Sequence, residues 1–117
     1  MIEKTFDELM DIVSNELKRN GFEYQIPTMG WRKGNVYVFV NESLRFGIKH
    51  DNVHIQAISY PPTLVGGTTI VESTIKSTQS DRKILSIIND VIAKIRDYER
   101  RKRNEREAAQ RTRARPE

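Results

Sequence analysis

Apolar residues recur every three or four positions over the first twenty residues of the chain. The repeat consists of Ile2, Phe6, Leu9, Met10, Val13 and Leu17. This spacing places them on one face of a helix. The pair Lys18-Arg19 suits the negative end of the helix dipole, and Asn20-Gly21 supplies the left-handed residue that ends many helices. We therefore expect an amphipathic helix over residues 3–20.

After Gly21 the apolar period changes to two, which is the period of a half-buried strand. In "FEYQI" the apolar residues Phe22, Tyr24 and Ile26 alternate with polar ones. Pro27 ends this strand, and we expect "TMGWRKGN" (residues 28–35) to form a loop. The further predicted strands are "NVYVFVN" at 35–41, "LRFGIKH" at 44–50, "NVHIQAIS" at 52–59 and "TTIVESTIKS" at 68–77. The last is β-branched and moderately polar, which favours an edge position.

Asp51 and Asn52 separate two of these strands, and both residue types tolerate the backbone of a tight turn. A two-residue turn here places Ile48 opposite Ile55 and Lys49 opposite His54. It also places Phe46 opposite Ala57 and Gly47 opposite Gln56. Apolar residues then meet apolar ones and polar residues meet polar ones, which predicts a hairpin with its turn at 51–52.

The strand at 36–40 is apolar on both faces, with three valines on one and two aromatic rings on the other. A three-residue "NES" loop after it directs the valines into the core, and a two-residue loop reverses the faces. We favour the first, because β-branched residues pack well beneath helices. The outer face of the sheet then displays Tyr37, Phe39, Arg45, Lys49, His54 and Gln56.

A second helix follows the Pro- and Gly-rich connection "YPPTLVGG", with Ser80 as its cap. Its apolar stripe comprises Ile84, Leu85, Ile88, Val91, Ile92, Ile95 and finally Tyr98. Continuing the count reaches Lys102, Glu105 and Ala109, which cannot form a buried face. The expected fold is a two-layer α+β domain over residues 1–98, in which a four- or five-stranded antiparallel meander packs against both helices on one face.

The charge is uneven along the 117 residues. Residues 1–98 contain 12 Lys or Arg and 12 Asp or Glu, whereas residues 99–117 contain 8 and 4, so the whole net charge of +4 lies in the C-terminal tail. The basic residues of the tail are Arg100, Arg101, Lys102, Arg103, Arg106, Arg111, Arg113 and Arg115. Arg makes bidentate contacts with phosphate, so this composition favours a helical or disordered extension that contacts nucleic acid. The alternative is a tail that only improves solubility.

Few residues suggest chemistry. The chain has no cysteine, which excludes thiolate metal sites and cysteine nucleophiles and makes the reducing cytoplasm the expected location. His50 and His54 are four residues apart, but across a strand and turn their rings need not converge on a metal. We expect no enzyme activity, no metal, no cofactor and no membrane span.

Two functions compete on this basis. The first is a small non-catalytic protein that binds RNA or single-stranded DNA through the tail, with the outer sheet face as a second contact, extended by Trp31, Arg32 and Lys33. The second is a regulator or inhibitor module that docks on a larger intracellular machine through its sheet face, its edge strand or the apolar loop "PPTLVGG". The alternative to a binding role for the rings on strand 36–40 is that they are buried beneath Ile58, a loop or a second subunit. A homodimer is compatible with either function.

Overall fold

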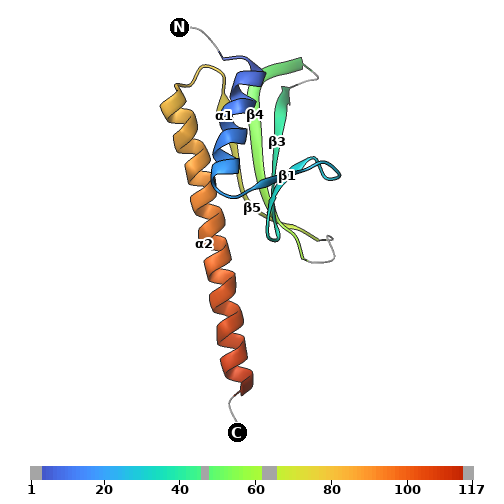
Figure 1. The fold of residues 1–117 in the computed structure, drawn as a ribbon, viewed down its shortest axis with the longest axis vertical. Coiled ribbons are helices and arrows are strands. Elements are labelled where there is room, and N and C mark those ends of the chain that lie inside the picture. Colours follow the sequence, from blue (N-terminus) through green and yellow to red (C-terminus); the bar gives the residue numbers. More distant parts are fainter. Residues whose placement is uncertain (1–3, 46–47, 62–65, 115–117) are drawn as a thin grey trace.

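Two helices and five strands follow one another in the order helix, sheet, helix (Figure 1). The computed structural model describes residues 4–45, 48–61 and 66–114. The elements are α1 (Phe6–Arg19), β1 (Glu23–Gln25), β2 (Gly30–Lys33), β3 (Val36–Arg45), β4 (Ile48–Ser59), β5 (Thr68–Lys76) and α2 (Asp81–Ala114). The strands lie in the sheet in chain order, and all neighbours are antiparallel. The predicted two-layer α+β meander is confirmed, and β5 is at its edge.

Helix α1 begins and ends where its local sequence provides partners for the free backbone groups. The Thr5 hydroxyl accepts a hydrogen bond from the backbone N–H of Glu8 at 3.2 Å. At the other end Gly21 has φ +89° and donates to Lys18 O, and the N–H of Phe22 donates to Leu17 O at 3.0 Å. This pair of bonds is the Schellman arrangement, which glycine permits because it has no Cβ.

The core lies between the sheet and the two helices. Both helices contribute their apolar stripes to one buried cluster: Leu9, Val13 and Leu17 from α1, and Ile84, Ile88, Val91, Ile92 and Ile95 from α2. The sheet side of the same cluster includes Val36 and Val38. The prediction that the valines of this strand face the helices is therefore confirmed, and the rings of Tyr37 and Phe39 lie on the opposite face of β3.

The first half of the sheet differs from the sequence-based expectation. Residues 30–33, predicted as part of a loop, form strand β2, in which Trp31 pairs with Val38. Trp31 reaches the core, and its burial holds the segment against the sheet. The predicted half-buried face of residues 22–26 is wrong beyond Phe22, because Tyr24 and Ile26 are 48% and 80% exposed. Strand β1 is short and lies at the sheet edge, where fewer neighbouring elements can cover its side chains.

The predicted hairpin turn at Asp51-Asn52 is also wrong. Strand β4 runs unbroken from Ile48 to Ser59, and β3 pairs with it as far as Arg45 opposite Ile48. The predicted "NES" loop is strand too, with a shift of register between Glu42 and Leu44. One long ladder pairs more backbone groups than two short hairpins, and Asp and Asn tolerate a turn without requiring one. Phe46 and Gly47, which were assigned to the hairpin, lie outside the described residues.

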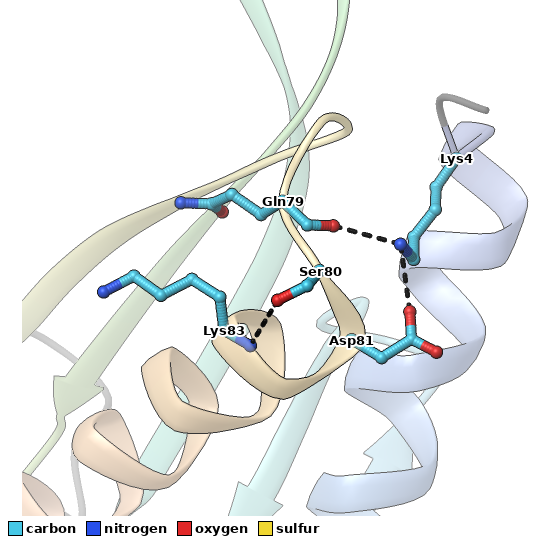
Figure 2. Close-up of polar contacts among 5 residues, drawn as sticks. All are labelled: Lys4, Gln79, Ser80, Asp81 and Lys83. Carbon is cyan, nitrogen blue, oxygen red and sulfur yellow. Dashed lines mark hydrogen bonds and ion pairs between the residues drawn. The ribbon is translucent and has the colours of Figure 1, made fainter. Parts of the chain in front are cut away.

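Contacts at both ends of α1 hold the first half of α2. The Ser80 hydroxyl caps α2 by accepting from the N–H of Lys83 at 3.2 Å, as predicted (Figure 2). Lys4 Nζ donates to Gln79 O at 3.0 Å and forms an ion pair with Asp81 at 2.9 Å. At the far end of α1, Arg96 Nη2 donates to Asn20 Oδ1 at 3.0 Å. The contacts therefore fasten α2 from Asp81 to Arg96.

Beyond Arg96 the helix continues past the body of the domain. The 34 residues of α2 correspond to about 51 Å of helix, and the molecule measures 67 × 28 × 24 Å. The lower half of α2, drawn in orange to red, extends away from the sheet (Figure 1). Residues 99–111 are all exposed, so this half of α2 adds nothing to the core. Within the described residues the tail is helical as far as Ala114, and helix was one of the two states expected for it.

Candidate functional site

A cleft of about 750 Å³ lies where α2 passes the end of the sheet. One wall is the segment of α2 from Arg96 to Arg106. The other wall consists of the turn before β3, the end of β4 and the start of β5, including Gly34, Asn35, Tyr60 and Thr68. The N–H of Tyr60 donates to Asn35 O at 2.9 Å, which joins two parts of this second wall. We call this hollow the basic cleft.

Cations dominate the wall formed by the helix. Its charged members are Arg96, Arg100, Lys102, Arg103, Arg106 and the single acid Glu99. Cations line the cleft because Lys102 and Arg106 lie on the same face of the helix as Ile88 and Ile95. Ile88, Ile95 and Lys102 follow one another at intervals of seven residues, and Arg106 lies four residues after Lys102. Where the sheet ends, the helix face that carried isoleucine carries cations instead. The side of α2 that is apolar over the core is therefore positive over the cleft.

The cations of the cleft differ in their partners. Arg100 forms an ion pair with Asp97 at 2.9 Å, and Lys102 pairs with Glu105 at 3.4 Å while its Nζ lies 5.7 Å from the Tyr98 ring. Arg103 and Arg106 form no ion pair with any side chain in the described part of the chain. These two guanidinium groups keep their full set of donors for a ligand.

Two aromatic rings also line the basic cleft. Tyr60 and Tyr98 are both half-buried and stand on opposite walls. Neither ring was selected from the sequence, and neither was Arg96, which lies just before the segment counted as the tail. The signal that could have found Arg96 and Tyr98 is the helical count itself, since Arg96 precedes Arg103 by about two turns and Tyr98 precedes Lys102 by about one.

Of the tail residues selected from the sequence, only some face the cleft. Arg100, Lys102, Arg103 and Arg106 line it, whereas Arg101 and Arg111 are exposed elsewhere on the helix. Arg111 Nε donates to Glu107 O at 3.4 Å. Arg115 and the side chain of Arg113 lie outside the described residues.

The outer face of the sheet is packed more tightly than an open binding surface. Tyr37 is only 5% exposed. Its ring stacks on Phe39 at a centroid distance of 6.1 Å, meets the edge of Tyr60 at 5.4 Å, and has the Arg32 guanidinium 5.7 Å away. Phe39 is half-buried and lies over Gly30, where a Cβ would approach within 2.7 Å of its ring. These neighbours leave little of the Tyr37 ring for a base to stack on.

The polar residues of this face pair with the next strand. His54 Nδ1 lies 3.5 Å from Thr74 Oγ1, and Gln56 Nε2 donates to Glu72 Oε1 at 2.9 Å. The side chains of Arg45, Lys49 and His50 lie outside the described residues. Within the residues that are described, no group of three or more His, Cys, Asp or Glu side chains converges as a metal site would.

The segment Trp31–Lys33 does not act as one surface. Trp31 faces the helices, with Tyr24 tilted against it at 5.3 Å and Lys18 Nζ 5.9 Å above it. Arg32 points to the outer face. Lys33 Nζ donates to Asn20 O at 2.9 Å and lies 5.8 Å from the Phe22 ring. Trp31 therefore anchors β2 and does not extend the outer face.

Fold and site together define a class: a helix–meander–helix domain with a cationic cleft beside an overhanging helix. No protein-family model matches the chain, and no curated protein or solved structure matches it either. No helix in the described ranges is both long enough and apolar enough to cross a membrane.

Proposed function

We propose that the protein binds nucleic acid without catalysis, and that its ligand is single-stranded RNA or single-stranded DNA held in the basic cleft. The observation that carries the proposal is the pair Arg103 and Arg106. Both line the cleft, and neither has an ion-pair partner among the described residues. Guanidinium groups make bidentate hydrogen bonds to phosphate, so a polyanion supplies the partners that they lack.

The two walls of the cleft favour a single strand over a duplex. A single strand is narrow enough to contact the helix on one side and the end of the sheet on the other. Its unpaired bases can stack on aromatic rings, and Tyr60 and Tyr98 line the cleft. The bases of a duplex are already stacked on one another and gain nothing from these rings.

Some cations of the helix repel one another, and this repulsion also supports a ligand. Arg103 and Arg106 are three residues apart, and Lys102 and Arg106 are four apart. Like charges at these spacings destabilise a helix by about 0.2–0.5 kcal/mol per pair. Because the core ends at Ile95, these cations do not contribute to its packing. A bound phosphate relieves the repulsion.

The proposal is tested by comparing two double variants that remove equal charge from the same helix. Arg103→Gln with Arg106→Gln changes the cleft, and Arg101→Gln with Arg111→Gln changes exposed positions outside it. In a salt titration with oligouridylate and oligothymidylate, the cleft variant should bind more weakly. Two lost phosphate contacts lower the log–log salt slope by about 1.4 for a single strand. Equal losses in both variants would mean that the cleft is not the site.

A second candidate function, docking on a protein partner, is favoured by a different observation. The hairpin that joins β1 to β2 exposes Tyr24, Ile26 and Met29, the last two by 80% and 73%. Exposed apolar groups gathered on a projecting loop suit a groove on another protein. If the purified protein binds no nucleic acid at low salt, this candidate takes precedence. Self-association remains a prediction, and the same surface is available to it.

A further inference from the structure

A second hollow, of about 360 Å³, lies beside the basic cleft. It is lined by Gly21, Glu23, Gln25, Arg32, Lys33 and Gly34. Gly34 also lines the basic cleft, so the two hollows meet at the turn between β2 and β3. Any ligand that leaves the basic cleft over this turn enters the second hollow.

The second hollow presents two cations and one acid, and contacts with the body orient both cations. Arg32 Nε donates to Gly34 O at 2.9 Å, which leaves the terminal nitrogens of the guanidinium for other partners. Lys33 Nζ donates to Asn20 O at 2.9 Å. Side chains held in this way lose less conformational freedom when a ligand arrives than free ones do.

Gly34 leaves the connection between the hollows open. Its φ is +62°, a left-handed conformation that side chains other than Asn and Asp rarely adopt. A Cβ built there meets nothing within 4 Å. The backbone conformation thus favours a residue without a side chain at the turn that borders both hollows.

We infer that the two hollows form one track, and that a single strand long enough to leave the basic cleft passes over Gly34 and places a phosphate at Arg32. This inference rests on the proposed function. Arg32 then contributes to the binding of long oligonucleotides only, whereas Arg103 and Arg106 contribute to the binding of oligonucleotides of every length. The site size of the protein, in nucleotides, is set by both hollows together.

The test is a length series of oligothymidylates, from a dinucleotide to about 16 nucleotides, which spans the usual range for single-strand sites. The full chain is compared with Arg32→Gln, with Gly34→Asn and with Arg82→Gln, an exposed charge control at the start of α2. The shortest oligonucleotides should bind all four proteins equally. For the longest, Arg32→Gln should lower the salt slope by about 0.7, and Arg82→Gln should not.

Gly34→Asn should keep the turn, because Asn tolerates the left-handed backbone, while its side chain obstructs the track. It should therefore weaken binding of long oligonucleotides and spare short ones. If the parent protein binds long oligonucleotides and Arg32→Gln matches it at every length and salt concentration, the track is wrong and the basic cleft stands alone. If the parent binds none of the series, the proposed function fails, and the track with it.

Discussion

Tyr37 lies on the face of β3 that points away from the helices, yet its ring is almost completely covered. Phe39, Tyr60 and the Arg32 guanidinium surround it. Burying an aromatic ring in this way contributes to stability, and it removes the ring from any ligand. The residue was a stacking candidate on sequence grounds, and the geometry assigns it a packing role.

We expect Tyr37→Ala to lower the free energy of unfolding by about 3 kcal/mol, because it removes a buried ring from a packed cluster. Oligonucleotide affinity, measured where the variant is still folded, should change little. Phe39→Ala, at a half-buried position, should cost less in urea unfolding. The opposite result, an unchanged midpoint with affinity lowered by about 1–3 kcal/mol, would identify Tyr37 as a base-stacking residue.

Individual positions differ in how far their sequence predicts their role. The strand at 36–40 is apolar on both faces, so the preference of β-branched residues for packing beneath helices, and not the alternation alone, placed its valines in the core. The alternation at 22–26 was not enough to bury Ile26, because alternation sets the face of a side chain and not whether anything covers it. Arg103 lines the basic cleft and Arg101 does not, because only Arg103 lies on the side of α2 that faces the end of the sheet. No local sequence pattern encodes where the sheet ends relative to the helix.

Helix α2 combines a packed half and an exposed half. Ile84 to Ile95 supply its core residues, and residues 99–111 are exposed throughout. A helix as short as residues 99–111 would be only marginally stable in water if it were isolated. The pairs Asp97–Arg100 and Lys102–Glu105, with Lys102 over Tyr98, support the exposed half, together with its good helix formers.

We expect Ile92→Asp to destabilise the domain by about 3 kcal/mol or more, because it places an unpaired carboxylate in the core. Leu85→Asp, on the same helix at a position 36% exposed, is the matched control and should cost much less. Thermal or urea unfolding followed by circular dichroism measures both. Equal losses, or none, would mean that the packed stripe of α2 has been assigned incorrectly.

The helices were more predictable than the strands. Caps and apolar periods are local signals, so Gly21 ends α1 and Ser80 caps α2 as predicted, although α1 begins after its cap Thr5 and not at residue 3. Strand boundaries depend on partners far away in the chain. The Asp51-Asn52 pair resembles a turn, but β3 continues to pair beyond it, and residues 30–33 become a strand because Trp31 finds a place opposite Val38.

At the scale of the whole molecule, charge and packing occupy different parts. The body carries balanced charge and the entire core, whereas the overhanging half of α2 carries the excess cations. Contacts at Lys4–Asp81 and Asn20–Arg96 fix the direction in which the helix leaves the body (Figure 1). This direction forms the basic cleft, because it carries the cations past the end of the sheet.

We expect residues 1–98 to fold alone and the helix beyond them to supply the electrostatic part of binding. The most direct test is a salt titration of single-strand binding with the full chain and with a chain that lacks residues 99–117. The shortened chain should melt at the same temperature, since none of the described residues beyond Ile95 belongs to the core. Its log–log slope should fall by about three to four units, as expected for four or five lost phosphate contacts, with much lower affinity at low salt. Unchanged affinity at an unchanged slope would contradict the account.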